Sequence, residues 1–127
     1  MAQERVARLV GVYDADAGLL GELAFVTGRV LGLVRCALCE IMHGPHGEEP
    51  TLRRLSLAHG IEVRMLHRNE QPADLRRVTE GNTPCIVAET PRGYEALVTR
   101  ADLECCQGDV VCLDRLLQRA LAARRPG

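Results

Sequence analysis

Four strand-like stretches separated by helix-like stretches constrain this chain more than any other feature of its sequence. The strand-like stretches are rich in β-branched or alternating apolar residues and cover 6–13, 61–66, 85–88 and 94–99. Helical patterns cover 18–33, 36–43, 52–59, 72–80, 101–106 and the segment from 109 onward. This alternation predicts an α/β fold, with one mixed four-stranded sheet and helices on both faces. The 127 residues predict a single domain, 1–127.

The composition argues against several functional classes. Phe25, Tyr13 and Tyr94 are the only aromatic residues, so the chain lacks the stacking surfaces typical of single-stranded nucleic-acid binding. A net charge of −1 provides no attraction to nucleic acid or to an anionic membrane. The sequence contains no lysine, which excludes P-loop and Schiff-base lysine chemistry. Ser56, its only serine, lies inside a predicted helix, which argues against a Ser-His-Asp hydrolase.

The distribution of apolar residues predicts a cytoplasmic protein. No stretch reaches the roughly 18 apolar residues that a membrane span requires, and the first residues show no signal-peptide core. Thiols in the cytoplasm are mostly reduced, so clustered cysteines there indicate metal or catalytic chemistry more often than structural disulfides.

The segment 35–47 concentrates the reactive side chains of the chain. Cys36 and Cys39 form a C-x-x-C motif, and two histidines follow it closely. If Cys36 begins a helix, its thiolate is stabilised there and by the adjacent Arg35. Cys39 would lie one turn further on, within reach to resolve a mixed disulfide. This pattern predicts a thiol–disulfide redox protein whose partner is a protein thiol or a small-molecule thiol.

Two alternatives remain open for the same segment. A non-catalytic protein could hold zinc or copper through Cys36, Cys39 and His43, with His46 or Cys85 as the fourth ligand. Alternatively, the two cysteines could pack as small buried hydrophobes, leaving an interaction module without thiol chemistry.

A second group of cysteines, at Cys105, Cys106 and Cys112, follows the predicted sheet. Cys112 lies six residues after Cys106, which is not helical i+3 or i+4 spacing. Packing against the sheet is therefore the expected role of this group. The aliphatic face of the terminal helix is expected to serve either the core or a homodimer.

Thr83-Pro84 immediately precedes a predicted strand, and together with the order of elements this motif resembles the thioredoxin-like fold in its short glutaredoxin-like form. The resemblance implies a cis proline at Pro84 that faces a thiol active site. The chain also resembles small bacterial proteins that pair a Y-D-A-D motif, here at 13–16, with a C-x-L-C motif, here at 36–39.

The chain departs from that resemblance at one place. The family's C-x-x-C directly follows the first strand, where this chain has Asp14 and Asp16. A helix of about 15 residues is roughly 22 Å long, so we expect Cys36 and Cys39 to lie away from the usual reactive corner. Asp14 and Asp16 are expected at that corner near Thr83-Pro84, where they either cap a helix or act as acid, base or cation ligands.

Overall fold

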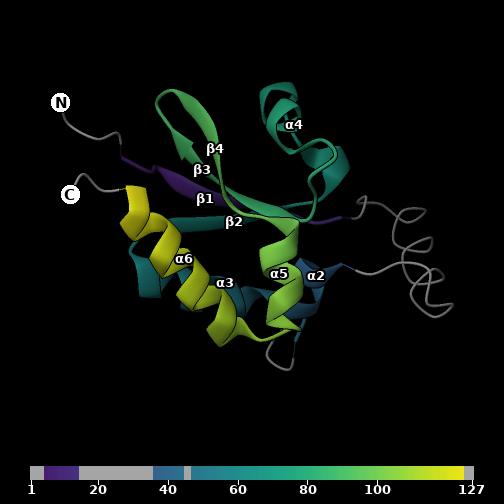
Figure 1. Ribbon diagram of the computed structural model, residues 1–127, viewed down its shortest axis with the longest axis vertical. Coiled ribbons are helices and arrows are strands. Elements are labelled where there is room, and N and C mark those ends of the chain that lie inside the picture. Colours follow the sequence, from purple (N-terminus) through teal and green to yellow (C-terminus); the bar gives the residue numbers. More distant parts are fainter. Residues whose placement is uncertain (1–4, 15–35, 45–46, 125–127) are drawn as a thin grey trace, which may run out of the picture.

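The computed structural model describes residues 5–14, 36–44 and 47–124. The elements, labelled as in Figure 1, are β1 (Arg8–Val12), α2 (Ala37–Met42), α3 (Glu48–His59), β2 (Glu62–Leu66), η1 (Arg68–Glu70), α4 (Ala73–Thr79), β3 (Cys85–Thr90), β4 (Gly93–Val98), α5 (Arg100–Cys106) and α6 (Val110–Arg124). The predicted helix at 18–33 lies outside the described residues, as do Asp16, Arg35 and His46. No described helix is long and apolar enough to cross a membrane.

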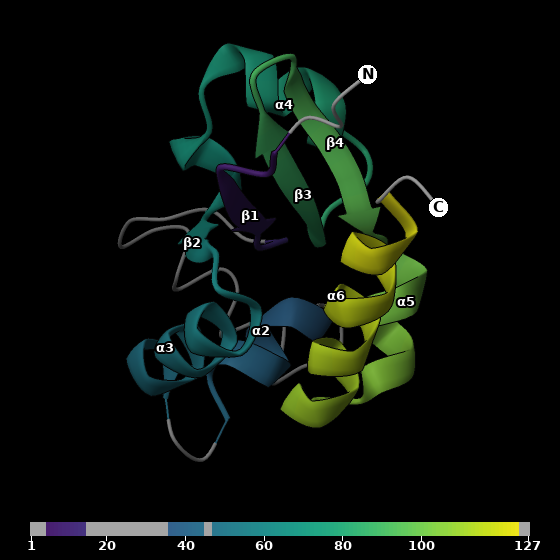
Figure 2. The ribbon, with the colours of Figure 1, turned by 90° about the vertical axis from the view of Figure 1, so that its left-hand side faces the viewer.

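The strands form a four-stranded mixed sheet in the order β2-β1-β3-β4. β1 pairs in parallel with β2 and antiparallel with β3, and β3 and β4 form an antiparallel hairpin. Figures 1 and 2 show α4 on one side of this sheet and α2, α3, α5 and α6 on the other. The prediction of a mixed four-stranded sheet with helices on both faces is therefore confirmed.

Alternation along β1 divides the interior into two clusters. Leu9 and Tyr13 point toward the cluster that contains the buried faces of α2, α3, α5 and α6. Val10 and Val12 point to the opposite face, where Leu75 of α4 covers them. This period of two is the geometry of a strand with both faces buried, and it agrees with the buried strand predicted from the β-rich run at 6–13.

Gly11 allows α2 to pack closely against β1. A Cβ atom at this position would lie 3.2 Å from the Leu38 side chain of α2 and 2.8 Å from the methyl carbon of Met65. Leu38 is completely buried. A side chain at position 11 would therefore displace the end of Met65 and press on Leu38 of the helix that carries Cys39.

The start of α3 differs from the predicted helical pattern, which covered 52–59 and so began at Leu52. The helix begins at Glu48, after Gly47, and the Thr51 hydroxyl donates a hydrogen bond to the Gly47 carbonyl over 2.7 Å. Pro50 occupies the third helical position, where a backbone N–H would have no partner within the helix, and acidic residues favour the positive end of the helix. The prediction began the helix after Pro50 and overlooked the tolerance of the first turn for proline.

The α5–α6 corner corrects the expectation for the second cysteine group. Cys106 and Cys112 form a disulfide, with Cα atoms 5.4 Å apart, and Cys105 is an exposed thiol. The sequence argument applied the spacing of one continuous helix. Gln107 and Gly108 instead adopt positive φ angles of 49° and 80°, which reverse the chain and bring the two sulfurs together. Cys106 also packs in the core, so only that part of the expectation is confirmed.

Candidate active site

Cys36 caps the N-terminus of α2. Its backbone is extended, with φ −129° and ψ 106°, and its Sγ accepts a hydrogen bond from the Cys39 N–H over 3.3 Å. The first helical hydrogen bond runs from the Glu40 N–H to the Cys36 carbonyl over 3.1 Å. The prediction that Cys36 begins a helix, with Cys39 one turn further on, is confirmed.

The Cys36 sulfur also contacts the end of β1. The Asp14 N–H donates to Cys36 Sγ over 3.4 Å, although the two residues are 22 positions apart in the sequence. The expectation that the C-x-x-C lies away from this corner is therefore wrong. The error was to convert the sequence separation into distance along one helix, whereas the contact shows that the chain returns to Asp14 at Cys36.

These contacts make Cys36 an acidic thiol. Hydrogen bonding to the Cys39 thiol, followed by the N–H groups of Asp14 and Cys39, lowers the pKa of Cys36 to about 7. Burial and the Asp14 carboxylate oppose this change, but they are outweighed. Both Cys36 and Cys39 are thiols, with exposed fractions of 1% and 7%.

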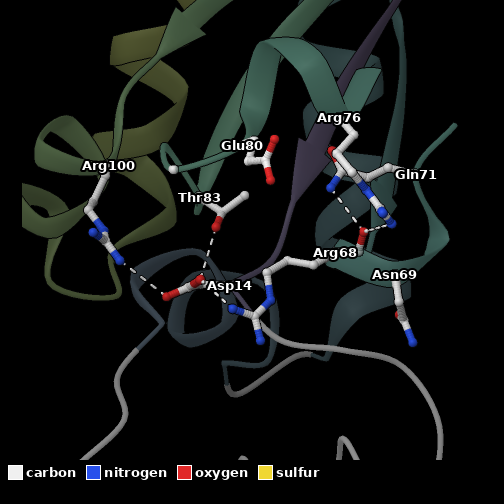
Figure 3. Close-up of a pocket in the computed structure, with 9 residues that line it drawn as sticks. Asp14, Arg68, Asn69, Gln71, Arg76, Glu80, Thr83 and Arg100 are labelled. Atoms are coloured by element: carbon white, nitrogen blue, oxygen red, sulfur yellow. Dashed lines mark hydrogen bonds and ion pairs between the residues drawn. The ribbon is translucent and has the colours of Figure 1, made fainter. Parts of the chain in front are cut away.

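The Asp14 carboxylate gathers three side chains at the same corner. Thr83 Oγ1 donates to Asp14 Oδ1 over 2.9 Å, Arg68 Nη1 lies 3.3 Å from Oδ1, and Arg100 Nη2 lies 3.2 Å from Oδ2. Figure 3 shows these groups converging from different elements around a cavity of about 480 Å³ that Arg76 also lines. The expected approach of Asp14 to Thr83-Pro84 is confirmed, and the Thr83–Pro84 peptide bond is cis.

Sequence reasoning missed Arg68 and Arg100, although strand pairing contains a signal for Arg68. β1 and β2 are parallel, and Val12 pairs with Leu66, so residues just beyond Leu66 lie beside residues just beyond Val12. A model of the sheet drawn from the sequence could therefore have placed Arg68 near Asp14. Arg100, the first residue of α5, follows β4, and its position depends on the fold of the hairpin.

A second network, centred on Tyr13, lies beside the thiols and was also missed. The buried Tyr13 hydroxyl donates to Glu48 Oε2 over 2.9 Å, and His43 Nε2 lies 3.0 Å from the same oxygen. The Tyr13 ring also contacts the rings of His43 and His67, with centroids 5.4 and 5.1 Å away. Burial and the neighbouring Glu48 raise the pKa of Tyr13, so this hydroxyl remains a hydrogen-bond donor.

The candidate metal ligands do not converge in the part of the chain that the structure describes. No group of three or more Cys, His, Asp or Glu side chains there could hold a metal ion. His43 is engaged with Glu48, and His46 lies outside the described residues. Cys85 belongs to the core cluster on the other face of the sheet from Cys36 and Cys39. Burial raises the pKa of Cys85 to about 11.

The described corner combines an acidic thiol, a second thiol one helical turn away and a cavity lined by arginines. Thiolates are the nucleophiles in thiol–disulfide exchange, so this arrangement is suited to attack on a disulfide sulfur. Comparisons of the chain with protein-family models, curated proteins and solved structures found no match.

Proposed function

We propose that this chain is a thiol–disulfide redox protein with a thioredoxin-like fold, in which residues 15–35 are inserted between β1 and the helix that carries the C-x-x-C. Two features support the fold assignment: the strand order β2-β1-β3-β4 with only β1 and β2 parallel, and the position of Cys36 at the end of the first strand. Thr83, which resembles the Thr of the family's Thr-Pro motif, reaches the same corner through Asp14.

The observation that carries the functional proposal is the environment of the Cys36 sulfur. It accepts hydrogen bonds from two backbone N–H groups, those of Asp14 and Cys39. Such donors stabilise a thiolate more than a neutral thiol, because hydrogen bonds to an ionised acceptor are roughly twice as strong as neutral ones. A cysteine that served only as a small core residue would not need them.

In the proposed reaction, the Cys36 thiolate attacks one sulfur of a partner disulfide. A Cys36–partner sulfur bond forms, the partner's sulfur–sulfur bond breaks, and one partner sulfur leaves as a thiolate. Cys39 then loses its proton to solvent and attacks Cys36 Sγ. This step forms the Cys36–Cys39 disulfide and releases the second partner thiolate. The pair loses two electrons, and the partner disulfide gains them.

Burial sets a condition on this reaction. With 1% of Cys36 exposed, a partner disulfide reaches the sulfur only after neighbouring side chains move. Oxidation of the pair by a small disulfide is therefore expected to be faster than oxidation by a folded protein disulfide, and native alkylation of Cys36 is expected to be slower than that of the exposed Cys105.

A residue-resolved redox titration tests the proposal. Because the chain contains arginine but no lysine, trypsin places the three groups of cysteines on separate peptides: Cys36 and Cys39 on 36–53, Cys85 on 78–92, and the remaining three on 101–115. The protein is equilibrated with defined ratios of reduced and oxidised dithiothreitol, quenched with acid, transferred into denaturant with an alkylating agent at neutral pH, and digested. Peptide 36–53 should change from two alkylated thiols to an internal disulfide in a single reversible two-electron transition.

Two variants make this titration decisive. Cys36→Ser should abolish the transition of peptide 36–53, whereas Cys105→Ser should leave it unchanged. If the wild-type peptide shows no reversible transition, the redox proposal is wrong and the cysteines only pack. Stoichiometric zinc or copper in untagged protein purified under reducing conditions would instead support the metal-binding alternative.

A further inference from the structure

We infer that Arg68 and Arg100 are positioning residues for Cys36, which act by holding the Asp14 carboxylate between them. This inference rests on the proposed redox function and identifies residues that tune it. Arg68 follows β2 and Arg100 begins α5, yet each reaches a different oxygen of Asp14, at 3.3 and 3.2 Å. Asp14 is therefore held from both sides, and its own N–H is the group that contacts Cys36 Sγ.

The geometry gives Asp14 two opposing effects on Cys36. Its backbone N–H donates to the sulfur and favours the thiolate, whereas its carboxylate is a negative charge beside a sulfur that must become negative. Two guanidinium groups and the Thr83 hydroxyl engage this carboxylate. Pairing with cations cancels much of its field at the sulfur and fixes the direction of the N–H.

Few other titratable groups reach the sulfur in the described part of the chain. Cys39 on α2 has the strongest effect, and Tyr13, the residue after β1, also interacts with the Cys36 charge. Glu48 of α3 is engaged by Tyr13 and His43. In the described part of the chain, the two arginines are thus cations that act on the thiol pair through a chain of contacts, because each pairs with Asp14, whose N–H contacts the sulfur.

The redox potential of the Cys36–Cys39 couple is the readout that separates this role from simple structural support. A less stable thiolate makes the reduced form less favourable and the potential more negative. Arg68→Gln and Arg100→Gln should each favour the disulfide about three- to tenfold in the exchange equilibrium with dithiothreitol, since both guanidiniums are half exposed and solvent screens their charge. A tenfold change corresponds to about 30 mV.

Asp14→Asn should shift the exchange equilibrium in the opposite direction. It removes the carboxylate charge but keeps the backbone N–H, so it should favour the dithiol by a similar factor. In the double variant Asp14→Asn/Arg100→Gln, the Arg100 effect should shrink, because its partner no longer carries a charge. Arg100→Lys keeps the positive charge and should restore most of the wild-type equilibrium.

Arg76→Gln is the matched control. Arg76 lines the same cavity, but its guanidinium donates a hydrogen bond to the Arg68 backbone carbonyl rather than to Asp14, so the equilibrium should change less than twofold. The inference fails if Arg68→Gln, Arg100→Gln and Asp14→Asn all shift the equilibrium in one direction, or if Arg76→Gln has an equal effect. Absence of any reversible Cys36–Cys39 couple in the wild-type protein would instead refute the proposed function.

Discussion

Cys36 and Cys85 are both buried at the same end of β1, but on opposite faces of the sheet. Their pKa values nevertheless change in opposite directions: the pKa of Cys36 is lowered to about 7, and that of Cys85 is raised to about 11. Cys85 pairs through its backbone with Val12. Burial of its side chain is the cause of the raised pKa. Cys36 is equally inaccessible, but it has hydrogen-bond donors directed at its sulfur. Burial alone thus does not determine whether a cysteine is inert.

The largest expected difference between the two cysteines is in the pH dependence of stability. Cys36 has a lower pKa in the folded state than in an unfolded chain, where cysteine titrates near 8.5. Its stabilising contribution to the free energy of unfolding is therefore present above pH 8.5 and is lost as the pH falls through 7. Cys85 has a raised folded-state pKa, so its contribution is present below pH 8.5 and is lost as pH rises toward 11. Each of the two titrations should change the free energy of unfolding by about 2 kcal/mol between pH 7 and pH 10.

Urea unfolding in the presence of reductant, from pH 6 to pH 10, measures these two contributions. Cys36→Ser should remove the rise in the free energy of unfolding between pH 7 and 8.5, and Cys85→Ala should remove the decline above pH 8.5. Identical pH profiles for the two variants would show that the two thiols have the same acidity, contrary to the comparison.

Gly11→Ala should disturb the face of the sheet that carries Cys36 more than the face that carries Cys85. The added methyl group would meet Leu38 of α2 and Met65, and overpacking of this kind costs about 1–3 kcal/mol. Because Leu38 lies between Cys36 and Cys39 in α2, the acidity of Cys36 should decrease while that of Cys85 stays the same.

Gly44→Ala is the control for this substitution, because a Cβ there would lie an ordinary 3.5 Å from the Ile41 carbonyl oxygen. Its free energy of unfolding should stay within about 0.5 kcal/mol of the wild-type value. If Gly11→Ala destabilises the protein but leaves the Cys36 thiolate population unchanged, then the packing of α2 on β1 does not position the thiol.

Local patterns in the sequence were sufficient to predict the sheet and the helix that begins at Cys36. The β-rich run at residues 6–13 identified a buried strand, and the C-x-x-C was correctly placed at the start of a helix. The contact between Asp14 and Cys36 could not be predicted, because spacing along the chain carries no information on where an intervening segment returns. The Tyr13–Glu48–His43 network likewise depends on how α3 packs beside β1, which periodicity does not specify.

Direct titration of the Cys36 thiolate is the most decisive test of the account. Ultraviolet thiolate absorbance of the reduced protein should show its first step with a midpoint near pH 7. This step should be absent in Cys36→Ser, unchanged in Cys85→Ala, and shifted to higher pH in Cys39→Ala, which removes the hydrogen bond that contributes most. A first step above pH 8, or a step near pH 7 that persists in Cys36→Ser, would contradict the claim that this corner of the sheet creates an acidic thiol.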